Sequence, residues 1–374
     1  MRQAKTLFAV FRLPLPSKSA QGDHHEQSPP RPNPRLRQNA RRFWAAWQQQ
    51  EAQLVQLSDI EFVEQANDLL RQFCPECIVE REGNAPDSDD LPSLVFSSEG
   101  IREHFPQVQA LAELAQTQRY HVRAFRSPES SVAPDLSIDD FGIGIGDFLL
   151  NTSDVAIALN EWRMLPALEI AFTRPIPTDM CDHAQNIAII ILDHIIGEWA
   201  ASVKIGMVDF VDNIAPERAM SFTALPKKLN QMWRELGYTG VYPEPEWQFG
   251  TYQIEEDEDR EQDALVLMRN ESAASLLGRA DMGWVVFVEA QLASKADLDA
   301  AYELQDSIEA EASLNQQGIF TLSVMNMTNG TRTMYYNSSN PAGLVEKAVV
   351  LCEQCPLPAE VSCQYDPNWS YYRF

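Results

Sequence analysis

Two Cys-x-x-Cys pairs are the residues whose type and spacing most directly suggest chemistry. The first pair is Cys74 and Cys77, and the second is Cys352 and Cys355. Four thiolates at this spacing could hold zinc tetrahedrally if the two pairs met. Each pair, however, falls where a helix is expected to end, and there the helix dipole disfavours the thiolate that a thioredoxin-type site needs. We therefore interpret the four cysteines as small apolar side chains at helix ends, with a zinc site as the alternative and no cofactor expected.

A carboxylate–histidine group is the second candidate. Asp193 and His194 stand near the end of a predicted apolar helix, and Glu198 follows the helix-ending Gly197. If this helix end borders a cleft, the three side chains could form the acid–base set of a hydrolase. We favour the alternative, a helix terminus tied by hydrogen bonds. The sequence contains no Gly-x-Ser-x-Gly, phosphate-loop or His-Glu-x-x-His motif.

Aromatic and charged residues gather near the C-terminus. Such side chains make good anchors at interfaces between proteins. The candidate binding residues are Arg332, Tyr335, Asp366, Trp369 and Tyr372. We favour a second interpretation, in which the tail folds back and closes the core. In that case Arg332 would pair with the carboxylate of Asp306 or Asp366.

The charge of the chain is strongly negative and unevenly spread. The 374 residues carry a formal charge of −25, yet residues 1–42 hold nine Lys and Arg against two acidic residues. That segment has a net charge of +7, so the remainder carries −32. Such a surface repels nucleic-acid phosphates and anionic membranes, and it favours a basic protein partner or serves only solubility. We expect no direct binding to nucleic acid.

Several features predict a cytoplasmic protein without membrane contact. No apolar run approaches the ~20 residues that cross a bilayer. The run Leu7–Phe11 is too short for the core of a secretory signal and is followed by Arg12 and two prolines. Six cysteines in a chain of this length do not form a disulfide framework, so we predict reduced thiols.

The length predicts two α+β domains, because 374 residues exceed the usual size of one. Residues 1–40 are basic, rich in Pro, Ser, Gln and Arg from position 14 onward, and are predicted to be a disordered leader. Residues 41–236 form the N-terminal α+β domain. Residues 237–262 contain prolines and an acidic run and are predicted to be a linker. Residues 263–374 form the C-terminal domain.

Local signals place several elements of the N-terminal domain. Ser58 and Glu61 have the spacing of a capping box at the start of a helix. A strongly apolar helix over 178–196 is expected to end at Gly197. The last strand of this domain is predicted over 203–211.

The C-terminal domain has the element order of a ferredoxin-like sandwich, β-α-β-β-α-β. Ser294, with Asp297 three residues later, predicts the cap of its first helix. Asn329-Gly330 predicts a tight hairpin, because both turn residues must accept positive φ. Asn340-Pro341 predicts the start of the second helix. The strands are predicted at 284–288, 320–324, 331–337 and 361–365.

The residues from about Asp281 to Phe374 resemble a bacterial family named "domain of unknown function 695". The likeness rests on the helix Leu298–Glu309, the hairpin strand Thr331–Tyr336 and the Asp-Pro-x-Trp ending Asp366–Trp369. The upstream part is similar to the N-terminal region of larger uncharacterised bacterial proteins, through Ser98–Ile101 and Val122–Arg126 among other segments. This family brings no agreed activity, cofactor or catalytic residue, so the resemblance implies no role for any side chain.

These observations favour a non-enzymatic regulatory or protein-interaction protein with an acidic surface. The motivating features are the negative charge, the lack of a recognisable catalytic set and a small β-sheet domain suited to docking. One alternative is a hydrolase-like enzyme with its site near Asp193, His194 and Glu198. Another is an acidic partner that neutralises a basic toxin or nuclease.

Overall fold

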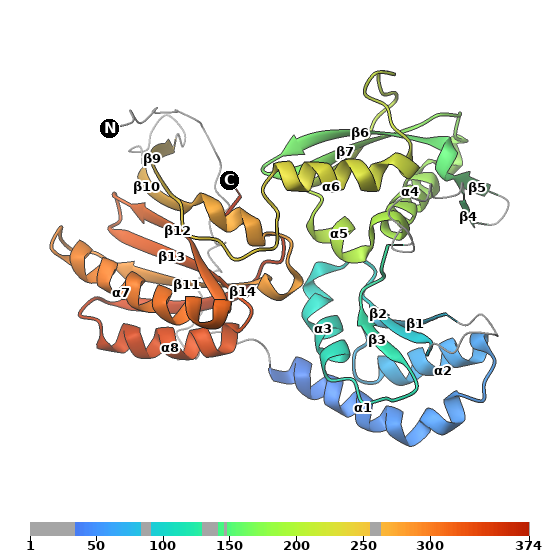
Figure 1. The fold of residues 1–374 in the computed structure, drawn as a ribbon, viewed down its shortest axis with the longest axis horizontal. Helices are drawn as coiled ribbons and strands as arrows, with labels where there is room; N and C mark the ends of the chain where they lie inside the picture. The colour runs from blue at the N-terminus through green and yellow to red at the C-terminus, as the bar shows by residue number, and fades with distance from the viewer. Residues whose placement is uncertain (1–33, 84–90, 129–140, 146–147, 255–262, 374) are drawn as a thin grey trace. The chain divides into compact units, whose positions relative to one another are not determined.

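The protein is a mixed α+β structure, as predicted from its sequence. The computed structural model describes residues 34–83, 91–128, 141–145, 148–254 and 263–373. The chain divides into two compact units, the first containing Asn33–Glu235 and the second containing Leu236–Phe374 (Figure 1). Within the described residues, no helix combines the length and the apolar character needed to cross a membrane.

The first unit mixes helices with short strands. Its α-helices are α1 (Pro34–Leu54), α2 (Asp59–Arg71), α3 (Phe105–Glu113), α4 (Cys181–Ile196), α5 (Glu198–Val203) and α6 (Leu225–Glu235). Its strands are β1 (Ile78–Glu82), β2 (Ser93–Ser97), β3 (His121–Ala124), β4 (Gly142–Ile145), β5 (Phe148–Asn151), β6 (Val155–Trp162), β7 (Leu165–Phe172) and β8 (Met207–Phe210).

The strands of the first unit pair within three sheets in the part of the chain that the structure describes. In the first sheet, β2 lies between an antiparallel β1 and a parallel β3. The strands β4 and β5 form a small antiparallel pair. In the third sheet, β7 lies between an antiparallel β6 and a parallel β8. Because each parallel pair needs a crossover, α3 follows β2, and α4 with α5 follows β7.

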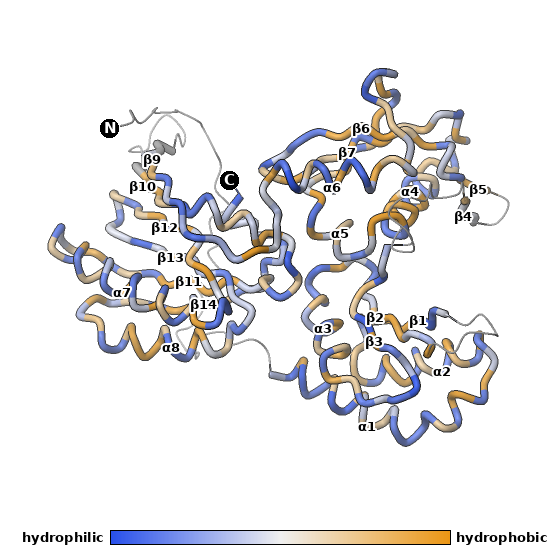
Figure 2. The backbone as a smooth tube through the Cα atoms, viewed as in Figure 1, coloured by the Kyte–Doolittle hydropathy of each residue, from blue (hydrophilic) through white to orange (hydrophobic). Residues whose placement is uncertain are grey.

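Aromatic side chains hold α1 against the first sheet. Phe43, Trp44 and Trp47 recur at helical spacing and are fully buried. The rings of Phe43 and Trp44 both meet Phe96 of β2, with ring centroids 5.7 and 5.8 Å apart. Edge-to-face pairs of this kind contribute beyond the area they bury. Figure 2 shows α4 as a mostly hydrophobic helix, and its buried side chains form another part of the core.

Two of the predicted boundaries are confirmed, and a third is displaced. Ser58 and Glu61 form the reciprocal hydrogen bonds of a capping box at the start of α2. The helix α4 ends at Gly197, which has a φ of +83°. The strand predicted over 203–211 is observed only at Met207–Phe210, because Val203 is the buried last residue of α5.

The second unit is one six-stranded antiparallel sheet with helices on one face. Its strands are β9 (Trp247–Ile254), β10 (Asp263–Asn270), β11 (Trp284–Gln291), β12 (Gly318–Asn326), β13 (Thr331–Ser338) and β14 (Ala359–Tyr365), and its α-helices are α7 (Asp297–Ser313) and α8 (Pro341–Gln354). The strand order is β14-β11-β13-β12-β10-β9. Both helices cover the same face of the sheet (Figure 1) and pack on its buried residues.

The side chains of the sheet separate by strand alternation. Val286 and Val288 join the cluster beneath α7 and α8, whereas Val285 and Phe287 belong to a cluster on the opposite face with Tyr335. Successive side chains of a strand point to opposite faces, so this division follows from the sequence alone.

Local signals place three boundaries of the second unit, one of them differently than expected. A hairpin forms at the predicted position, but its loop is the four residues 327–330, and of the two predicted turn residues only Gly330 has a positive φ, of +66°. Asn340 caps α8 by accepting the N–H of Gly343, as its sequence predicts. Ser294 is not the cap of α7, which begins at Asp297. There the carboxylate of Asp297 instead accepts the backbone N–H groups of Ala293 and Ser294 at 2.7 and 2.8 Å.

Two predicted boundaries between domains need correction. Residues 237–262 were expected to be a linker, but Trp247–Ile254 within them form β9, the outer strand of the sheet. Trp247 joins the core through the ring of Phe320, 5.1 Å away, and this long-range contact has no local sequence signal. The expected leader 1–40 ends earlier, because residues 34–40 begin α1. Residues 1–33 and 255–262 lie outside the described residues.

Candidate functional site

The predicted hydrolase residues lie around Arg126, which follows β3. Its guanidinium donates to the carboxylate of Glu80 in β1 at 2.7–3.1 Å. It also donates to Oδ2 of Asp193 in α4 at 3.0 Å. Burial disfavours the charged guanidinium, but hydrogen bonds and charges of the two carboxylates outweigh it and raise the pKa of Arg126. Arg126 therefore ties two distant elements together through charge-assisted hydrogen bonds.

Asp193 is only half satisfied by this pairing. Its Oδ1 is buried and has no hydrogen-bond partner among the described residues. Burial raises the pKa of Asp193, and the contact with Arg126 opposes that rise. The geometry thus uses Asp193 to neutralise an internal arginine, because a buried charge is tolerated only when it is paired.

Glu198 holds the loop that follows β2. Its side chain is 1 % exposed. Oε1 accepts the hydroxyl of Ser97 at 2.9 Å and the N–H groups of Ser98 and Gly100 at 3.2 and 3.1 Å. Oε2 accepts the N–H of Arg126 at 3.2 Å. A carboxylate that already accepts four internal donors is placed to fix backbone, not to exchange protons with a substrate.

The loop held by Glu198 has a conformation that few residues adopt freely. Glu99 and Gly100 have φ values of +55° and +79°, in the left-handed region. The fixed position of Glu198 depends on Gly197, whose added Cβ would come within 2.9 Å of Pro128. Glycine at 197 is therefore required by both the backbone angle and the close approach of the neighbouring chain.

His194 is the third residue of the predicted acid–base set. Its ring lies edge-on to Phe141, with ring centroids 6.4 Å apart. Its positive form favours the ionised form of Asp193. The structure therefore places the three predicted residues in one region. Asp193 accepts a hydrogen bond from the side chain of Arg126, and Glu198 accepts hydrogen bonds from backbone N–H groups. Sequence reasoning missed Arg126 and Glu80, whose pairing has no local spacing signal.

The two thiol pairs belong to different units. Cys74 and Cys77 lie in the first unit, both buried, and burial raises the pKa of each to about 12. Cys352 lies in the second unit, where burial raises its pKa to about 11; Cys355 follows α8 and is partly exposed. Across the described residues, no group of three or more His, Cys, Asp or Glu side chains is placed to hold a metal ion.

Three of the predicted binding residues near the C-terminus are part of the core. Trp369 is fully buried and donates its indole N–H to the carbonyl of Met282 at 2.9 Å. The hydroxyl of Tyr372 donates to the carbonyl of Asn270 at 2.8 Å. Asp366 is 5 % exposed and accepts the hydroxyl of Ser370. The tail thus folds back onto its own unit, and these side chains present no surface to a partner.

The two predicted binding residues on β13 are also buried. Tyr335 stacks on Tyr371 of the tail, with ring centroids 5.6 Å apart. Arg332 is 3 % exposed, donates to Ser323 and Gln305, and lies 3.9 Å from the ring centre of Tyr302. Burial lowers its pKa.

The expected ion pair of Arg332 with Asp306 or Asp366 is not among its contacts within the described residues, which are with Ser323, Gln305 and the ring of Tyr302. Asp306 acts on Arg332 only through its charge. The reason is geometric, since the side chain of Arg332 bonds to neutral groups on α7 and β12.

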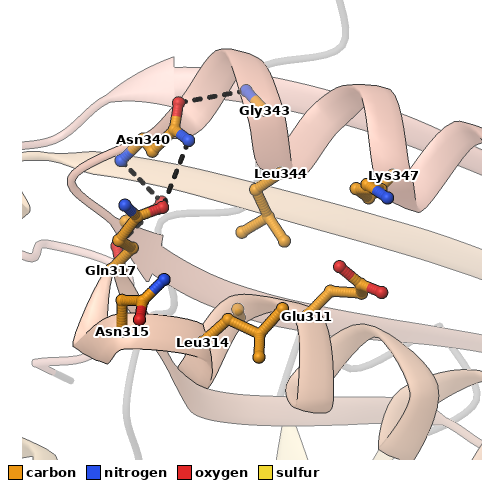
Figure 3. A pocket seen from close by; sticks show the side chains of 10 residues that line it. Glu311, Leu314, Asn315, Gln317, Asn340, Gly343, Leu344 and Lys347 are labelled. Atoms are coloured by element: carbon orange, nitrogen blue, oxygen red, sulfur yellow. Dashed lines mark hydrogen bonds between the residues drawn. The ribbon is translucent and has the colours of Figure 1, made fainter.

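A groove between α7 and α8 was not found by sequence reasoning (Figure 3). It has a volume of about 180 Å³. Leu314 and Leu344 point into it, and Glu311 and Lys347 stand across from each other at one end (Figure 3). At the other end the amide of Asn340 donates to Gln317 at 3.2 Å while also capping its own helix. These hydrogen bonds connect the start of α8 to the segment that follows α7.

Comparison of the chain with protein-family models, with curated proteins and with solved structures gave no match in any of the three. The resemblance to the family named "domain of unknown function 695" therefore stays a prediction. Any functional conclusion for this chain has to come from its own residues.

Proposed function

We propose that this protein is a non-enzymatic regulatory protein that works by binding basic proteins. The proposal rests on one observation: the two carboxylates that the sequence suggests as catalytic are already bonded to other groups of the protein. Glu198 accepts four internal hydrogen bonds, and Asp193 is paired with Arg126. General acid–base catalysis needs a side chain that can exchange a proton with a substrate. These two carboxylates instead accept hydrogen bonds from groups within the protein.

The charge of the chain supports a basic protein as the partner. The second unit, residues 236–374, contains 22 Asp and Glu against seven Lys and Arg, a formal charge of −15. Such a surface attracts cationic proteins at long range and repels nucleic-acid phosphates. We propose the cytoplasm as the place of action, because reducing conditions there would keep the six free thiols reduced. A partner that neutralises a basic toxin or nuclease is a special case of the same activity.

We also propose that the second unit is a ferredoxin-like sandwich enlarged by the hairpin β9–β10. Support comes from the element order β11-α7-β12-β13-α8-β14 and from the strand order β14-β11-β13-β12, with every neighbouring pair antiparallel. These are the features of a split β-α-β arrangement. The resemblance to the family of unknown function is part of the same proposal and assigns no chemistry.

The test uses the full chain as bait in a cell lysate at low and at high salt. Retained proteins are identified, purified and titrated back against the chain by calorimetry. We expect a basic partner whose affinity falls as salt rises, because salt screens attraction between exposed charges. If no purified protein binds at low salt, or if binding is indifferent to salt, the proposal is wrong.

A parallel assay addresses the hydrolase alternative. The chain and its Asp193→Asn and Glu198→Gln variants are incubated with chromogenic ester and phosphate substrates. We expect no turnover above buffer in any of the three. Turnover by the wild-type chain that Asp193→Asn abolishes would replace the binding proposal with the enzymatic one.

A further inference from the structure

The outer edge of β9 is open in the part of the chain that the structure describes. β9 is the last strand of the sheet and pairs only with β10 there. Its register with β10 runs without a shift over eight residue pairs, from Trp247 opposite Asn270 to Ile254 opposite Asp263. In an antiparallel pair, alternate residues point their N–H and C=O groups away from the neighbouring strand. The outer side of β9 therefore presents a regular row of donors and acceptors.

This edge lacks the devices that usually block strand pairing. Proteins protect open edges with charges, prolines, bulges or short strands. The eight residues Trp247–Ile254 contain no charged residue and no proline, although 22 % of the chain is charged. The opposite edge of the same sheet differs, because β14 carries a charge within the strand, the exposed Glu360. Of the two edge strands, only β9 has no charged residue along its length.

An exposed aromatic side chain lies on the open strand. Phe249 is 67 % exposed, and its neighbours Gln248 and Thr251 are exposed as well. Phe249 points to the same face as Trp247, which packs against Phe320 of the core. An apolar side chain of an added strand would cover the ring of Phe249 and extend this core outward. Aromatic side chains in that position are the usual anchors of an interface.

Charge selects which strand can be added. Glu244 and Glu246 are exposed immediately before β9, and the second unit as a whole carries −15. A second copy would bring the same charge to the edge, and like charges across an interface oppose pairing. A strand whose uncharged centre is flanked by Lys or Arg would instead meet complementary charge.

We propose that the open edge of β9 binds an extended segment of a basic protein as a seventh strand of the sheet. The segment has an uncharged, β-prone centre that pairs with Trp247–Ile254, and Lys or Arg at the end that lies beside Glu244 and Glu246. Backbone hydrogen bonds give affinity in this mode of binding, and the side chains give selectivity. The inference rests on the proposed function and names the surface and the partner chemistry for it.

The test measures binding of a fluorescein-labelled decapeptide, Lys-Arg-Thr-Val-Thr-Val-Thr-Val-Arg-Lys, to the full chain by anisotropy. In the variant Phe249→Asp the edge gains a charge that blocks pairing, and we expect binding to fall about tenfold or more. Simple attraction between opposite charges would predict tighter binding by this variant. The matched control is Val350→Asp, which places the same charge on an exposed apolar residue of α8 and should leave affinity unchanged.

Two further variants keep the test independent of folding. Phe249→Thr retains β propensity and removes only the ring, so it should weaken binding with the sheet intact. The double variant Glu244→Lys/Glu246→Lys reverses the charge beside β9. It should bind the basic peptide more weakly, and it should bind a version of the peptide with Glu in place of Lys and Arg more tightly. Hydrogen exchange should slow at Trp247–Ile254 when the peptide binds, and less so at β14.

The outcomes that overturn the proposal are distinct. If Phe249→Asp binds the basic peptide as tightly as the wild type, the partner binds at a site other than β9. The proposed function would then still hold. No binding of any basic peptide or protein would remove both. A concentration-dependent dimer that Phe249→Asp abolishes would assign the edge to a second copy. Binding seen only after deletion of residues 1–33 would assign it to the chain's own N-terminal segment.

Discussion

The hydroxyl of Ser97 donates to the buried carboxylate of Glu198 at 2.9 Å, although the two residues stand 101 positions apart in the chain. Ser97 ends β2 and Glu198 begins α5, so this bond joins the sheet β1-β2-β3 to the helices that follow β7. Arg126 adds a second tie between the same parts through Glu80 and Asp193. The polar side chains that the sequence suggests as an active site thus connect the sheet β1-β2-β3 to α4 and α5 within the first unit.

Removing the carboxylate of Glu198 should destabilise the first unit strongly. In Glu198→Ala, the Ser97 hydroxyl and three backbone N–H groups lose their acceptor. Buried donors without partners are costly, so we expect a loss of about 3 kcal/mol or more in the free energy of unfolding by urea. Glu161→Ala, at an exposed carboxylate of β6, should change it by less than about 0.5 kcal/mol. Equal effects of the two substitutions would contradict the structural role of Glu198.

Sequence patterns predicted those parts of the fold that depend on neighbouring residues. The capping box of Ser58 and Glu61, the turn at Asn329-Gly330 and the cap at Asn340 each involve groups a few positions apart. Strand alternation in β11 likewise separates its two faces without reference to any partner.

The site and the strands β9 and β10 could not be predicted in this way. Arg126 meets Glu80 and Asp193 across 46 and 67 positions, and nothing in the local sequence marks that pairing. The sequence predicts a linker at the position of β9, because prolines and acidic residues surround it. Its place in the sheet depends on pairing with β10 and on the packing of Trp247, which are long-range contacts.

The buried thiols should react slowly in the native protein. Burial raises the pKa of Cys74 and Cys77 to about 12, so almost none of either thiol is ionised at pH 8. We expect iodoacetamide to modify Cys181, which is partly exposed, well before these two. Mass spectrometry of the digested protein measures the order of modification. Rapid modification of Cys74 that added zinc prevents would instead support the metal-site alternative.

The aromatic tail should be required for the stability of the second unit. Trp369 is fully buried and bonds to the carbonyl of Met282. Trp369→Ala should therefore lower the free energy of unfolding by about 3–5 kcal/mol, as for other large buried aromatic residues. The control Phe249→Ala removes a ring that is 67 % exposed and should have little effect on unfolding by urea. If Trp369→Ala leaves the free energy of unfolding unchanged, the tail does not stabilise the unit and is again a candidate for binding a partner.

Lys204 should make the stability of the first unit depend on pH in the alkaline range. It follows α5, and its ammonium lies 3.7 Å from the ring centre of Trp233. Burial lowers the pKa of Lys204 from 10.5 to about 8, because the charged form loses hydration. The ring of Trp233 compensates for part of that loss by attracting the cation.

The sign of this dependence follows from proton uptake. Between pH 8 and pH 10.5 the unfolded chain keeps a proton on Lys204 that the folded chain has released. Raising the pH through this window therefore favours the folded state at this residue. In Lys204→Met the contribution is absent, so the free energy of unfolding of the wild type, relative to the variant, should rise from pH 8 to pH 10. Comparing the two proteins cancels the titration of buried tyrosines and cysteines, which acts in the opposite direction.

Urea unfolding at both pH values measures the difference, and Lys228→Met provides the control at an exposed lysine of α6. The control should show no such change relative to the wild type between the two pH values. A wild-type advantage that shrinks as the pH rises would mean that Lys204 gains a counter-charge in the folded protein. In that case the contact with Trp233 would not be its main partner, and the lowered pKa would have to be abandoned.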